Sequence, residues 1–535
     1  MNWAMWGFRS AGRAVSVVLA ALAMGMPEAA VSQTTAFVQS LATAAANEPV
    51  IADWYRDSGY EALWTDAEDA PRRQAFFTAI MSAADNALPV QRYDVNALRS
   101  AFFAATTEAD RGRLEVMMSR AYLAWAHDLT SGVLEPSTID AGIVRQIAVI
   151  DPQVLLARMS AGDPETVLRG LYPRSSVYAQ LMKAQIRLAQ RIGDGGWGDI
   201  VPVDALSPGE QGPLVVALRD RLVLMDYMAP SASQTYDTVL QAAVERFQRA
   251  HGLTPNGIAD ESTMTEINLP PEDRLKSVIV AMERERWMRI DRSVRHIWVN
   301  LPEFQARIID HGRTVFQSRV VIGRNVPDMR SPEFSDEMEH MVINPSWGVP
   351  RSIIVKEYLP LLQQDPNAVG QLQVVDGRGR VVPRDSVDFA SYTSQNFPFD
   401  LRQPPSDGNA LGKVKFMFPN PYNIYLHDTP SKSLFAKEIR AFSHGCIRVA
   451  DPFDLAHALL SVQSTDAEAE FERVLKTGEE TTVKLLTPVP VHLVYFTAYP
   501  SAKGEITYAR DIYGRDAALF QALTEAGVVL GGVQG

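Results

Sequence analysis

The sequence predicts a multidomain α+β protein: a helical scaffold domain, a small helical module and a mainly β domain that carries an irregular insertion. Three observations lead to this prediction. The chain has 535 residues, well beyond the roughly 250–300 at which a single hydrophobic core stops growing. Apolar residues recur at spacings of three and four in the first part of the chain, as in amphipathic helices. After residue 295 the pattern changes to short apolar runs separated by turn residues, which is typical of strands.

The first 32 residues have the composition of a secretory signal peptide. Arg9 and Arg13 precede an apolar run over 14–26, and the small residues 30–32 offer a cleavage site before Gln33. The apolar run is shorter than the roughly 20 residues that a membrane span needs. We therefore expect export to the periplasm with cleavage, and an uncleaved inner-membrane anchor is the alternative.

The helical part of the chain divides into two predicted units. Residues 36–200 are expected to form the scaffold domain, which ends at a glycine-rich break over 193–198. Residues 207–268 are expected to form a compact module of two or three helices. The run Ala-Val-Glu-Arg-Phe-Gln-Arg-Ala-His-Gly-Leu-Thr-Pro-Asn-Gly over 243–257 resembles the peptidoglycan-binding module of cell-wall enzymes.

Residues 295–490 are predicted to form the mainly β domain. The runs 304–309 and 315–322 indicate a hairpin with a glycine turn. Residues 365–410 are rich in Pro, Gly, Asp and Gln, and such a long irregular segment inside a domain is often a lid over a site. Residues 491–535 are expected to add a strand and a helix packed on this domain.

Charge and cysteine usage narrow the function. The formal net charge of −12 argues against nucleic-acid binding, because a protein that neutralises phosphates needs a basic face. Cys446 is the one cysteine of the chain, so no disulfide can form within it. Such a thiol is either a buried core residue or a reactive group. A lone thiol in an oxidising compartment favours a chemical role, and we expect Cys446 to be a nucleophile.

The neighbours of Cys446 favour acyl transfer. Gly445 lets the backbone approach a substrate closely, so the N–H groups around it are candidates for an oxyanion hole. His427 ends a predicted strand and is the candidate base that a thiol needs. Tyr425 shares a strand face with His427 and either flanks the substrate or packs. Arg448 either binds a substrate carboxylate or pairs with a neighbouring acid.

The spacing of these residues resembles a known signature. His427, fifteen intervening residues and then Ser443-His444-Gly445-Cys446 resemble the motif of the L,D-transpeptidases, the YkuD-type catalytic domain. The chain is similar in particular to the large multidomain enzymes of the YcbB type. The similar stretches include 59–64, 128–132, 344–350, 409–416, 495–499 and 511–516. Where relatives usually have a Gln-x-Pro-Gly turn, this chain reads Arg-Gln-Pro-Pro-Ser-Asp-Gly-Asn over 402–409, so the resemblance does not extend to the conformation of the insertion there.

The resemblance implies a reaction. Cys446 would attack the carbonyl between the third residue, typically meso-diaminopimelate, and the terminal D-Ala of a peptidoglycan tetrapeptide stem. D-Ala would leave and a thioester acyl-enzyme would remain. His427, oriented by the backbone carbonyl of Asp428, would take the thiol proton. An amine of a neighbouring stem would then resolve the thioester and form a 3→3 cross-link. The resemblance implies no metal and no organic cofactor, and carbapenems are expected to acylate Cys446.

The resemblance also implies contacts around the reacting carbonyl. Backbone N–H groups of His444, Gly445 and Cys446 are expected to form the oxyanion hole, while the side chain of His444 is expected to be structural. The expected substrate-binding residues are Arg448, Tyr425 and Trp347.

Several alternatives stay open at the level of sequence. His427, His444 and Cys446 are potential zinc ligands, but the spacing lacks a second Cys pair or a helical His-x-x-x-His. A non-catalytic wall-binding protein is a second alternative, which the intact His427 and Cys446 pair disfavours. Within the enzyme interpretation, water as acceptor would make an L,D-carboxypeptidase, and a lipoprotein lysine would make an anchoring transferase.

Overall fold

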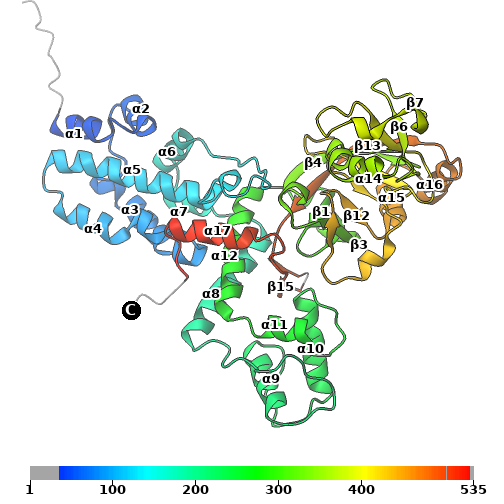
Figure 1. The fold of residues 1–535 in the computed structure, drawn as a ribbon. Coiled ribbons are helices and arrows are strands. Elements are labelled where there is room, and N and C mark those ends of the chain that lie inside the picture. Colours follow the sequence, from blue (N-terminus) through cyan, green and yellow to red (C-terminus); the bar gives the residue numbers. More distant parts are fainter. Residues whose placement is uncertain (1–34, 502, 531–535) are drawn as a thin grey trace, which may run out of the picture.

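The structure of the protein is a computed structural model that describes residues 35–501 and 503–530. The predicted signal peptide, residues 1–32, lies outside the described residues. Within them, no helix combines the length and the apolar character needed to span a membrane. The predicted α+β class is confirmed: helices dominate the first half of the chain and strands the second. Figure 1 shows a helical lobe, a small helical module below it and a β-rich lobe, which meet around α12.

The helical lobe contains eight α-helices. They are α1 (Ala36–Ala44), α2 (Pro49–Asp57), α3 (Ala70–Met81), α4 (Val95–Ala104), α5 (Glu108–Ser131), α6 (Pro152–Ala161), α7 (Pro164–Arg169) and α8 (Ser176–Gly193). The long α5 starts at a capping box in which Thr107 and Asp110 satisfy each other's backbone donors. Its buried Glu115 accepts hydrogen bonds from the backbone N–H groups of Leu63 and Trp64. A carboxylate buried in this way is tolerated because its oxygens have partners.

The small module contains α9 (Pro213–Leu224), α10 (Thr238–Ala250) and α11 (Glu261–Ile267). The module therefore has three helices, within the two or three expected. The core of the module includes Val244, Phe247 and Leu253, all of which are buried. Asp237 and Asp260 cap α10 and α11 by accepting hydrogen bonds from backbone N–H groups of the first turns.

Helix α12 (Pro271–Met288) joins the lobes, and the C-terminal helix α17 (Arg515–Glu525) lies against it (Figure 1). We expected the C-terminal helix to pack on the β domain. Instead, its apolar residues Leu519 and Leu523 belong to the same core cluster as Leu275 and Ile279 of α12. The apolar face of α12 is thus shared between α17 and the β domain, which contributes Val494 of the last long strand to the same cluster.

A buried ion cluster connects the three parts at this junction. Arg284 of α12 forms ion pairs with Glu333 of the β lobe and Asp516 of α17. Arg515 pairs in turn with Glu333 and with Asp140 of the helical lobe. Charges buried to this degree need partners on every side, so the cluster fixes the C-terminal segment relative to the β lobe.

The β lobe is built on a nine-stranded sheet in the order β11-β3-β12-β10-β9-β4-β13-β1-β2, and a further β2–β3 pairing closes the sheet on itself. Its strands are β1 (His296–Asn300), β2 (Gln305–Asp310), β3 (Arg313–Gly323), β4 (Phe334–Ile343), β9 (Val414–Met417), β10 (Leu426–His427), β11 (Ala441–Ser443), β12 (Ile447–Val449) and β13 (Thr481–Val494). The predicted hairpin is β2–β3, which turns at His311 and Gly312, both with positive φ. Helices α15 (Pro452–Leu460) and α16 (Ala467–Leu475) contribute to its core.

The insertion into this lobe is a folded cap with its own core. A four-stranded sheet runs in the order β5-β8-β6-β7, from β5 (Trp347–Gly348), β6 (Gln373–Val375), β7 (Val381–Val382) and β8 (Asp400–Gln403). The cap therefore starts before the predicted 365, because the helical segment ahead of that point packs into the same core. That segment is α13 (Arg351–Ile353), a π-helical stretch Ile354–Tyr358 and α14 (Leu359–Gln364). A π-helical stretch is rare and often marks a functional position. A separate hairpin precedes α17 and consists of β14 (Ala498–Pro500) and β15 (Ile506–Tyr508).

Candidate active site

Two short parallel strands bring the predicted base and nucleophile together. In the β10–β12 pairing, Leu426 lies opposite Ile447 and His427 lies opposite Arg448. The backbone N–H of Ile447 donates to the carbonyl of Tyr425, 3.1 Å away, and extends the pairing toward Cys446. Alternate residues of a strand share a face. Tyr425 and His427 on one strand, with Cys446 and Arg448 on the other, therefore form a two-by-two array on one face of the sheet.

His427 has the geometry of a base whose free nitrogen is Nε2. Its ring is buried, and Nδ1 lies 2.5 Å from the backbone carbonyl oxygen of Asp428. Because a carbonyl only accepts, Nδ1 carries the proton and Nε2 keeps its lone pair. Burial, and then the neighbouring Arg448 charge, lower the pKa of His427 to about 3. The imidazole is thus neutral throughout the neutral pH range, with the lone pair of Nε2 unprotonated.

The side chain of Asp428 holds the turn after β10 and does not face the imidazole. Its Oδ2 accepts from the Lys413 backbone N–H at 2.8 Å, and its Oδ1 accepts from Lys432 Nζ at 2.7 Å. Gly412 has φ +61° next to this carboxylate, and a Cβ there would lie 2.2 Å from Asp428 Oδ2. Gly412 and Lys432 therefore fix the backbone carbonyl of Asp428, which orients His427. Neither residue takes part in the reaction itself.

The nucleophile loop is held by serine hydroxyls on both sides of Gly445. Ser443 Oγ accepts from the Gly445 N–H at 3.1 Å and donates to the Cys446 carbonyl at 2.6 Å. Ser331 Oγ donates to the Gly445 carbonyl at 2.6 Å. Gly445 has φ +116°, a conformation that favours glycine. The loop geometry thus depends on three residues that do not react.

This geometry changes the predicted oxyanion hole. The Gly445 N–H is engaged by Ser443, so this conformation does not offer it to a substrate. Within the described residues, the N–H groups of His444 and Cys446 have no hydrogen-bond acceptor. In a trans peptide the C=O and the following N–H point in opposite directions. The hydrogen bond from Ser331 Oγ fixes the direction of the Gly445 carbonyl. The N–H of Cys446, in the same peptide group, therefore points to the opposite side of the loop.

Ser331 is anchored by a residue from the far end of the chain. Its hydroxyl accepts from the Gly323 N–H at 3.0 Å, and its own N–H donates to Tyr513 Oη at 3.2 Å. Tyr513 Oη donates to the Gly323 carbonyl at 2.6 Å. Sequence reasoning missed Ser331 and Tyr513, since neither lies near the motif around Cys446. A weak signal was present, because 511–516 belongs to the similar stretches.

The thiol of Cys446 is partly buried and neutral in the resting site. Its hydrogen bond runs to the carbonyl of Asn423, with Sγ 3.4 Å from the oxygen. Burial raises the pKa of Cys446 to about 11, against the opposing effects of hydrogen bonding with Tyr425 and of the Arg448 charge. A neutral thiol next to a neutral imidazole is therefore the resting state, and thiolate forms when His427 removes the proton during attack.

We expect the alkylation of Cys446 by iodoacetamide to speed up continuously as pH rises from 6 to 10. The pKa of the thiol is raised, so the thiolate fraction grows about tenfold per pH unit below about 11. Mass spectrometry of the intact protein against time would measure the rate. A resting thiolate–imidazolium pair would instead give a rate that is already level near pH 6, and that result would contradict the neutral resting state.

Arg448 has no acidic partner. Within the described residues it forms no ion pair, and its Nε is buried without a hydrogen-bond partner. Burial, and then the nearby Arg324, lower the pKa of Arg448. The sequence left open whether Arg448 pairs with an acid or binds a substrate carboxylate. The structure contains no such ion pair, and the guanidinium stays available to a ligand on the face that carries Cys446.

The side chain of His444 touches the cap. Its Nε2 lies 2.6 Å from Oε1 of Glu357, in the π-helical stretch of the insertion. Lys356 forms a second contact across the same boundary, with Nζ 2.8 Å from Asp328 Oδ2. Trp347 lies in the cap sheet and packs edge-on against Tyr358, so the structure does not bring its side chain into the array. Its predicted contact with substrate stays a prediction.

The residues around Cys446 do not fit a zinc site. Across 35–501 and 503–530, no three His, Cys, Asp or Glu side chains gather as metal ligands would. His427 directs Nδ1 at a backbone carbonyl, and His444 directs Nε2 at Glu357 in the cap. The arrangement instead brings together a thiol, a neutral base, free backbone donors and a cation without an ion pair among the described residues. These are the kinds of group that acyl transfer can use.

Known protein families match three parts of the chain. Residues 294–490 match the L,D-transpeptidase catalytic domain family (YkuD). Residues 49–184 match a scaffold domain, and residues 211–267 match a family described as "Putative peptidoglycan binding domain". A protein of Haemophilus influenzae described as "Putative L,D-transpeptidase" is 34% identical over 239 residues, which are 44% of this chain and 48% of that protein. The match thus spans about half the length of the relative.

The crystal structure of an L,D-transpeptidase from Xylanimonas cellulosilytica is 14% identical, with a TM-score of 0.17, and the match covers 55% of this chain and 98% of that one.

Proposed function

We propose that this chain forms 3→3 cross-links in peptidoglycan through a thioester on Cys446. The premise is the match of residues 294–490 to the L,D-transpeptidase catalytic domain family. The observation that carries the proposal is the β10–β12 pairing, which sets Cys446, His427, Tyr425 and Arg448 on one face. The peptidoglycan-binding module supports the same substrate class. Peptidoglycan lies outside the cytoplasmic membrane, so the proposal includes the periplasmic location expected from residues 1–32.

Acylation begins with transfer of the thiol proton to Nε2 of His427. The Cys446 sulfur attacks the carbonyl carbon between the third stem residue and the terminal D-Ala. The tetrahedral oxyanion accepts hydrogen bonds from the N–H groups of Cys446 and His444, which are free in the resting site. The C–N bond then breaks, the imidazolium returns its proton to the departing amine of D-Ala, and a thioester remains on Cys446.

Deacylation reverses the roles of the two residues. A neutral amine from the diaminopimelate of a second stem attacks the thioester carbonyl, and His427 takes a proton from that amine. The C–S bond breaks, the sulfur recovers the proton, and the two stems are joined through a new amide bond. Water in place of the amine gives a tripeptide, and a lipoprotein lysine gives an anchored protein, through the same acyl-enzyme.

Arg448 is assigned the recognition of a substrate carboxylate. It faces the same side as the nucleophile and has no acidic partner within the described residues. A guanidinium recognises a carboxylate through two parallel hydrogen bonds. A carboxylate bound there would also lie near the neutral imidazole and favour its protonation during attack.

We expect Arg448→Met to lower kcat/KM for tetrapeptide stems by about 10- to 100-fold, since a hydrogen bond to a charged group contributes roughly 1.5–3 kcal/mol. Part of the loss should appear in KM, and Arg448→Lys should recover part of it. Steady-state release of D-Ala would measure both constants. The matched control is Arg473→Met on the exposed surface of α16. A carboxylate-binding role would be wrong if Arg448→Met and Arg473→Met behaved alike.

The direct test of the proposed function is mass spectrometry of products after the purified protein is incubated with disaccharide-tetrapeptide. We expect cross-linked dimers with equimolar D-Ala, and none from Cys446→Ala. Tripeptide without dimers would replace the transpeptidase by a carboxypeptidase with the same acyl-enzyme. Absence of any reaction, or full activity of Cys446→Ala, would overturn the proposal.

A further inference from the structure

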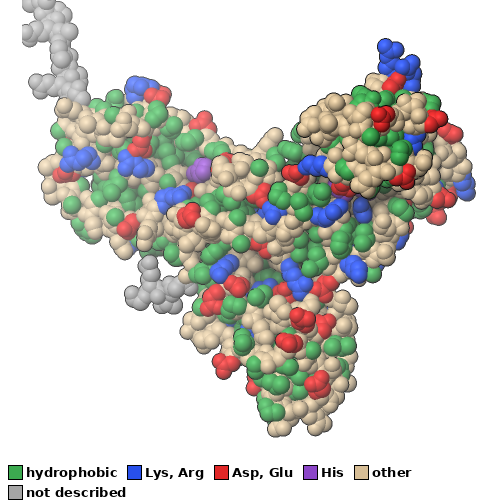
Figure 2. Space-filling model, viewed as in Figure 1, with side chains coloured by type: hydrophobic (Ala, Val, Ile, Leu, Met, Phe, Trp, Pro, Cys, Tyr) green, Lys and Arg blue, Asp and Glu red, His purple; other side chains and the backbone are tan. Residues whose placement is uncertain are grey.

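A groove of about 1090 Å³ lies between the small module and the β lobe, apart from the array around Cys446. One wall is the module loop 252–255, and another is formed by strands β1, β2 and β3. The segment 435–440, which precedes the nucleophile loop, closes one side, and the β14–β15 hairpin contributes a further edge. Figure 2 shows Lys and Arg side chains, with Asp and Glu side chains beside them, along the junction between the lower module and the rest of the molecule.

The groove carries an excess of positive charge in an acidic protein. Its lining cations are Arg249, Arg292, Arg307, Arg319, Lys437 and Arg440, and its lining carboxylates are Glu285, Glu303 and Glu438. Each of these carboxylates already has a cation. Glu285 pairs with Arg292, Glu303 with Arg307, and Glu438 with Arg510 outside the groove. The lining carboxylates therefore leave part of the positive charge without compensation, although the whole chain has a net charge of −12.

Two of the remaining cations are held in fixed positions. Arg319 Nη1 donates to the backbone carbonyl of Phe435 at 3.1 Å. Arg440 Nη1 donates to the carbonyl of Lys437 at 2.8 Å, and its guanidinium stacks 5.0 Å from the ring centre of Phe304. Within the described residues, neither arginine forms an ion pair with a carboxylate. Burial, and then the charge of Arg319, lower the pKa of Arg440 to about 10, against the opposing effects of the Glu303 and Glu438 charges. A bound anion would reduce the remaining cost of holding the two arginines close together.

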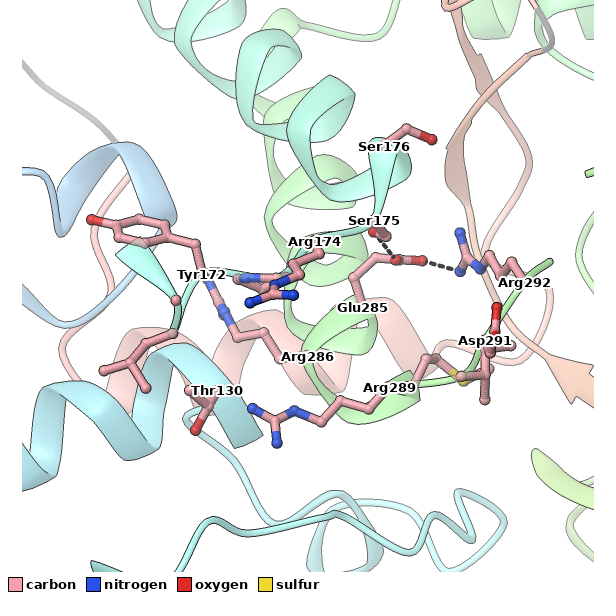
Figure 3. A pocket seen from close by; sticks show the side chains of 15 residues that line it. Thr130, Tyr172, Arg174, Ser175, Ser176, Glu285, Arg286, Arg289, Asp291 and Arg292 are labelled. Carbon is pink, nitrogen blue, oxygen red and sulfur yellow. Dashed lines mark hydrogen bonds and ion pairs between the residues drawn. The ribbon is translucent and has the colours of Figure 1, made fainter. Parts of the chain in front are cut away.

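Figure 3 shows why Arg292 is not part of this free charge. Its guanidinium meets Glu285, whose other carboxylate oxygen accepts from Ser175 Oγ at 2.9 Å. The pair separates the groove from a smaller cavity of about 460 Å³, into which Arg174 and Arg289 point from opposite walls. Arg249 pairs with Glu245 outside the groove. The lining cations that form no ion pair within the described residues therefore lie at the other side, around Arg319 and Arg440.

We propose that this groove is a second peptidoglycan site, in which Arg319 and Arg440 bind the carboxylates of stem peptides on a glycan strand. The identity of the ligand rests on the proposed function; the charge of the site does not. Stem peptides carry free carboxylates at regular intervals along a strand, and guanidinium groups bind carboxylates with two hydrogen bonds. One wall belongs to the peptidoglycan-binding module and the other to the catalytic lobe. A strand in the groove would therefore tie the module to the lobe that carries Cys446.

Binding of the full chain to purified, insoluble peptidoglycan sacculi tests this site. Cys446→Ala would be present throughout, so that turnover does not alter the ligand. We expect Arg319→Glu/Arg440→Glu to weaken co-sedimentation by at least about tenfold, since each charge-assisted contact contributes roughly 1.5 kcal/mol or more. Arg319→Gln/Arg440→Gln should weaken it less, and it replaces the first variant if charge reversal prevents folding. The control is Arg378→Glu/Arg473→Glu, which makes the same change of charge at two exposed positions outside the groove.

The outcomes separate the groove from the active site. Unchanged affinity in both groove variants, or an equal loss in the control, would overturn the second site. In the background that retains Cys446, the groove variants should form dimers from free disaccharide-tetrapeptide at the wild-type rate, because that small substrate needs the array alone. A groove variant that lost this activity as severely as binding would also contradict a separate site. If neither the wild type nor the groove variants formed dimers, the proposed function would fail. The measurement of binding to sacculi would still test the groove.

Discussion

His427→Gln is expected to slow acylation of Cys446 by about 10³- to 10⁴-fold at pH 7. The pKa of the thiol is about 11, so only about one molecule in ten thousand carries a thiolate at that pH without a base. Transfer of the proton to a positioned base typically contributes 10²- to 10⁴-fold, and Nε2 of His427 is the nitrogen left free by the hydrogen bond to Asp428. Single-turnover acylation by a carbapenem, followed by mass spectrometry, measures this rate.

The deficit of His427→Gln should shrink as pH rises toward the pKa of the thiol, because hydroxide then replaces the base. His457→Gln is the matched control: it removes a partly buried histidine on α15 of the same lobe, whose ring packs against Phe471. It should leave acylation within a few-fold of wild type. A pH-independent deficit, or equal losses in both variants, would show that His427 acts only through the fold.

Ser331→Ala is expected to slow acylation by about 10²- to 10³-fold while leaving alkylation of the thiol nearly unchanged. Ser331 fixes the Gly445 carbonyl and thereby aims the Cys446 N–H. Removal of one oxyanion donor typically costs a rate factor of this size. Alkylation by iodoacetamide builds no oxyanion, so the ratio of the two rates isolates the effect on the oxyanion hole. Ser331 is thus a positioning residue and does not touch the substrate.

Ser318→Ala provides the control for this prediction. Ser318 is a buried serine of the same lobe whose hydroxyl donates to Asp451 and accepts from its N–H, but it does not contact the nucleophile loop. Both substitutions should cost roughly 1–3 kcal/mol of stability through lost buried hydrogen bonds. Ser318→Ala should not change the ratio of acylation to alkylation. If Ser331→Ala lowered acylation and alkylation by the same factor, the oxyanion interpretation would be wrong.

The sequence predicted those parts of the site that lie close together along the chain. Cys446, Gly445 and His444 are consecutive, and the fifteen residues between His427 and Ser443 fit the return connection of two parallel neighbouring strands. Alternation along strands then placed Tyr425 and Arg448 on the reactive face. The helices of the small module were also predictable, because their caps and apolar spacing are local features.

The missed features depend on contacts between distant segments. Ser331 reaches Gly445 across more than a hundred residues, and Tyr513 reaches Gly323 from the turn that precedes α17. No local pattern marks a hydroxyl that fixes a carbonyl so far away in sequence. The occupied Gly445 N–H was missed for a different reason: its partner Ser443 is only two residues away, but the contact depends on the rotamer of the serine, which the sequence does not specify. The start of the cap was misplaced because a helical segment, predictable by itself, packs into the core of the insertion.

The most direct test of the central claim is the intact mass of the protein, quenched in acid within milliseconds of mixing with disaccharide-tetrapeptide. We predict a covalent adduct whose added mass equals the substrate minus D-Ala, located on Cys446 by peptide mapping and released by hydroxylamine as a thioester. The adduct should be absent from Cys446→Ala and should disappear from wild type as dimers form. Dimer formation by a protein that never carries this adduct, or an adduct on another residue, would contradict Cys446 as the acyl carrier.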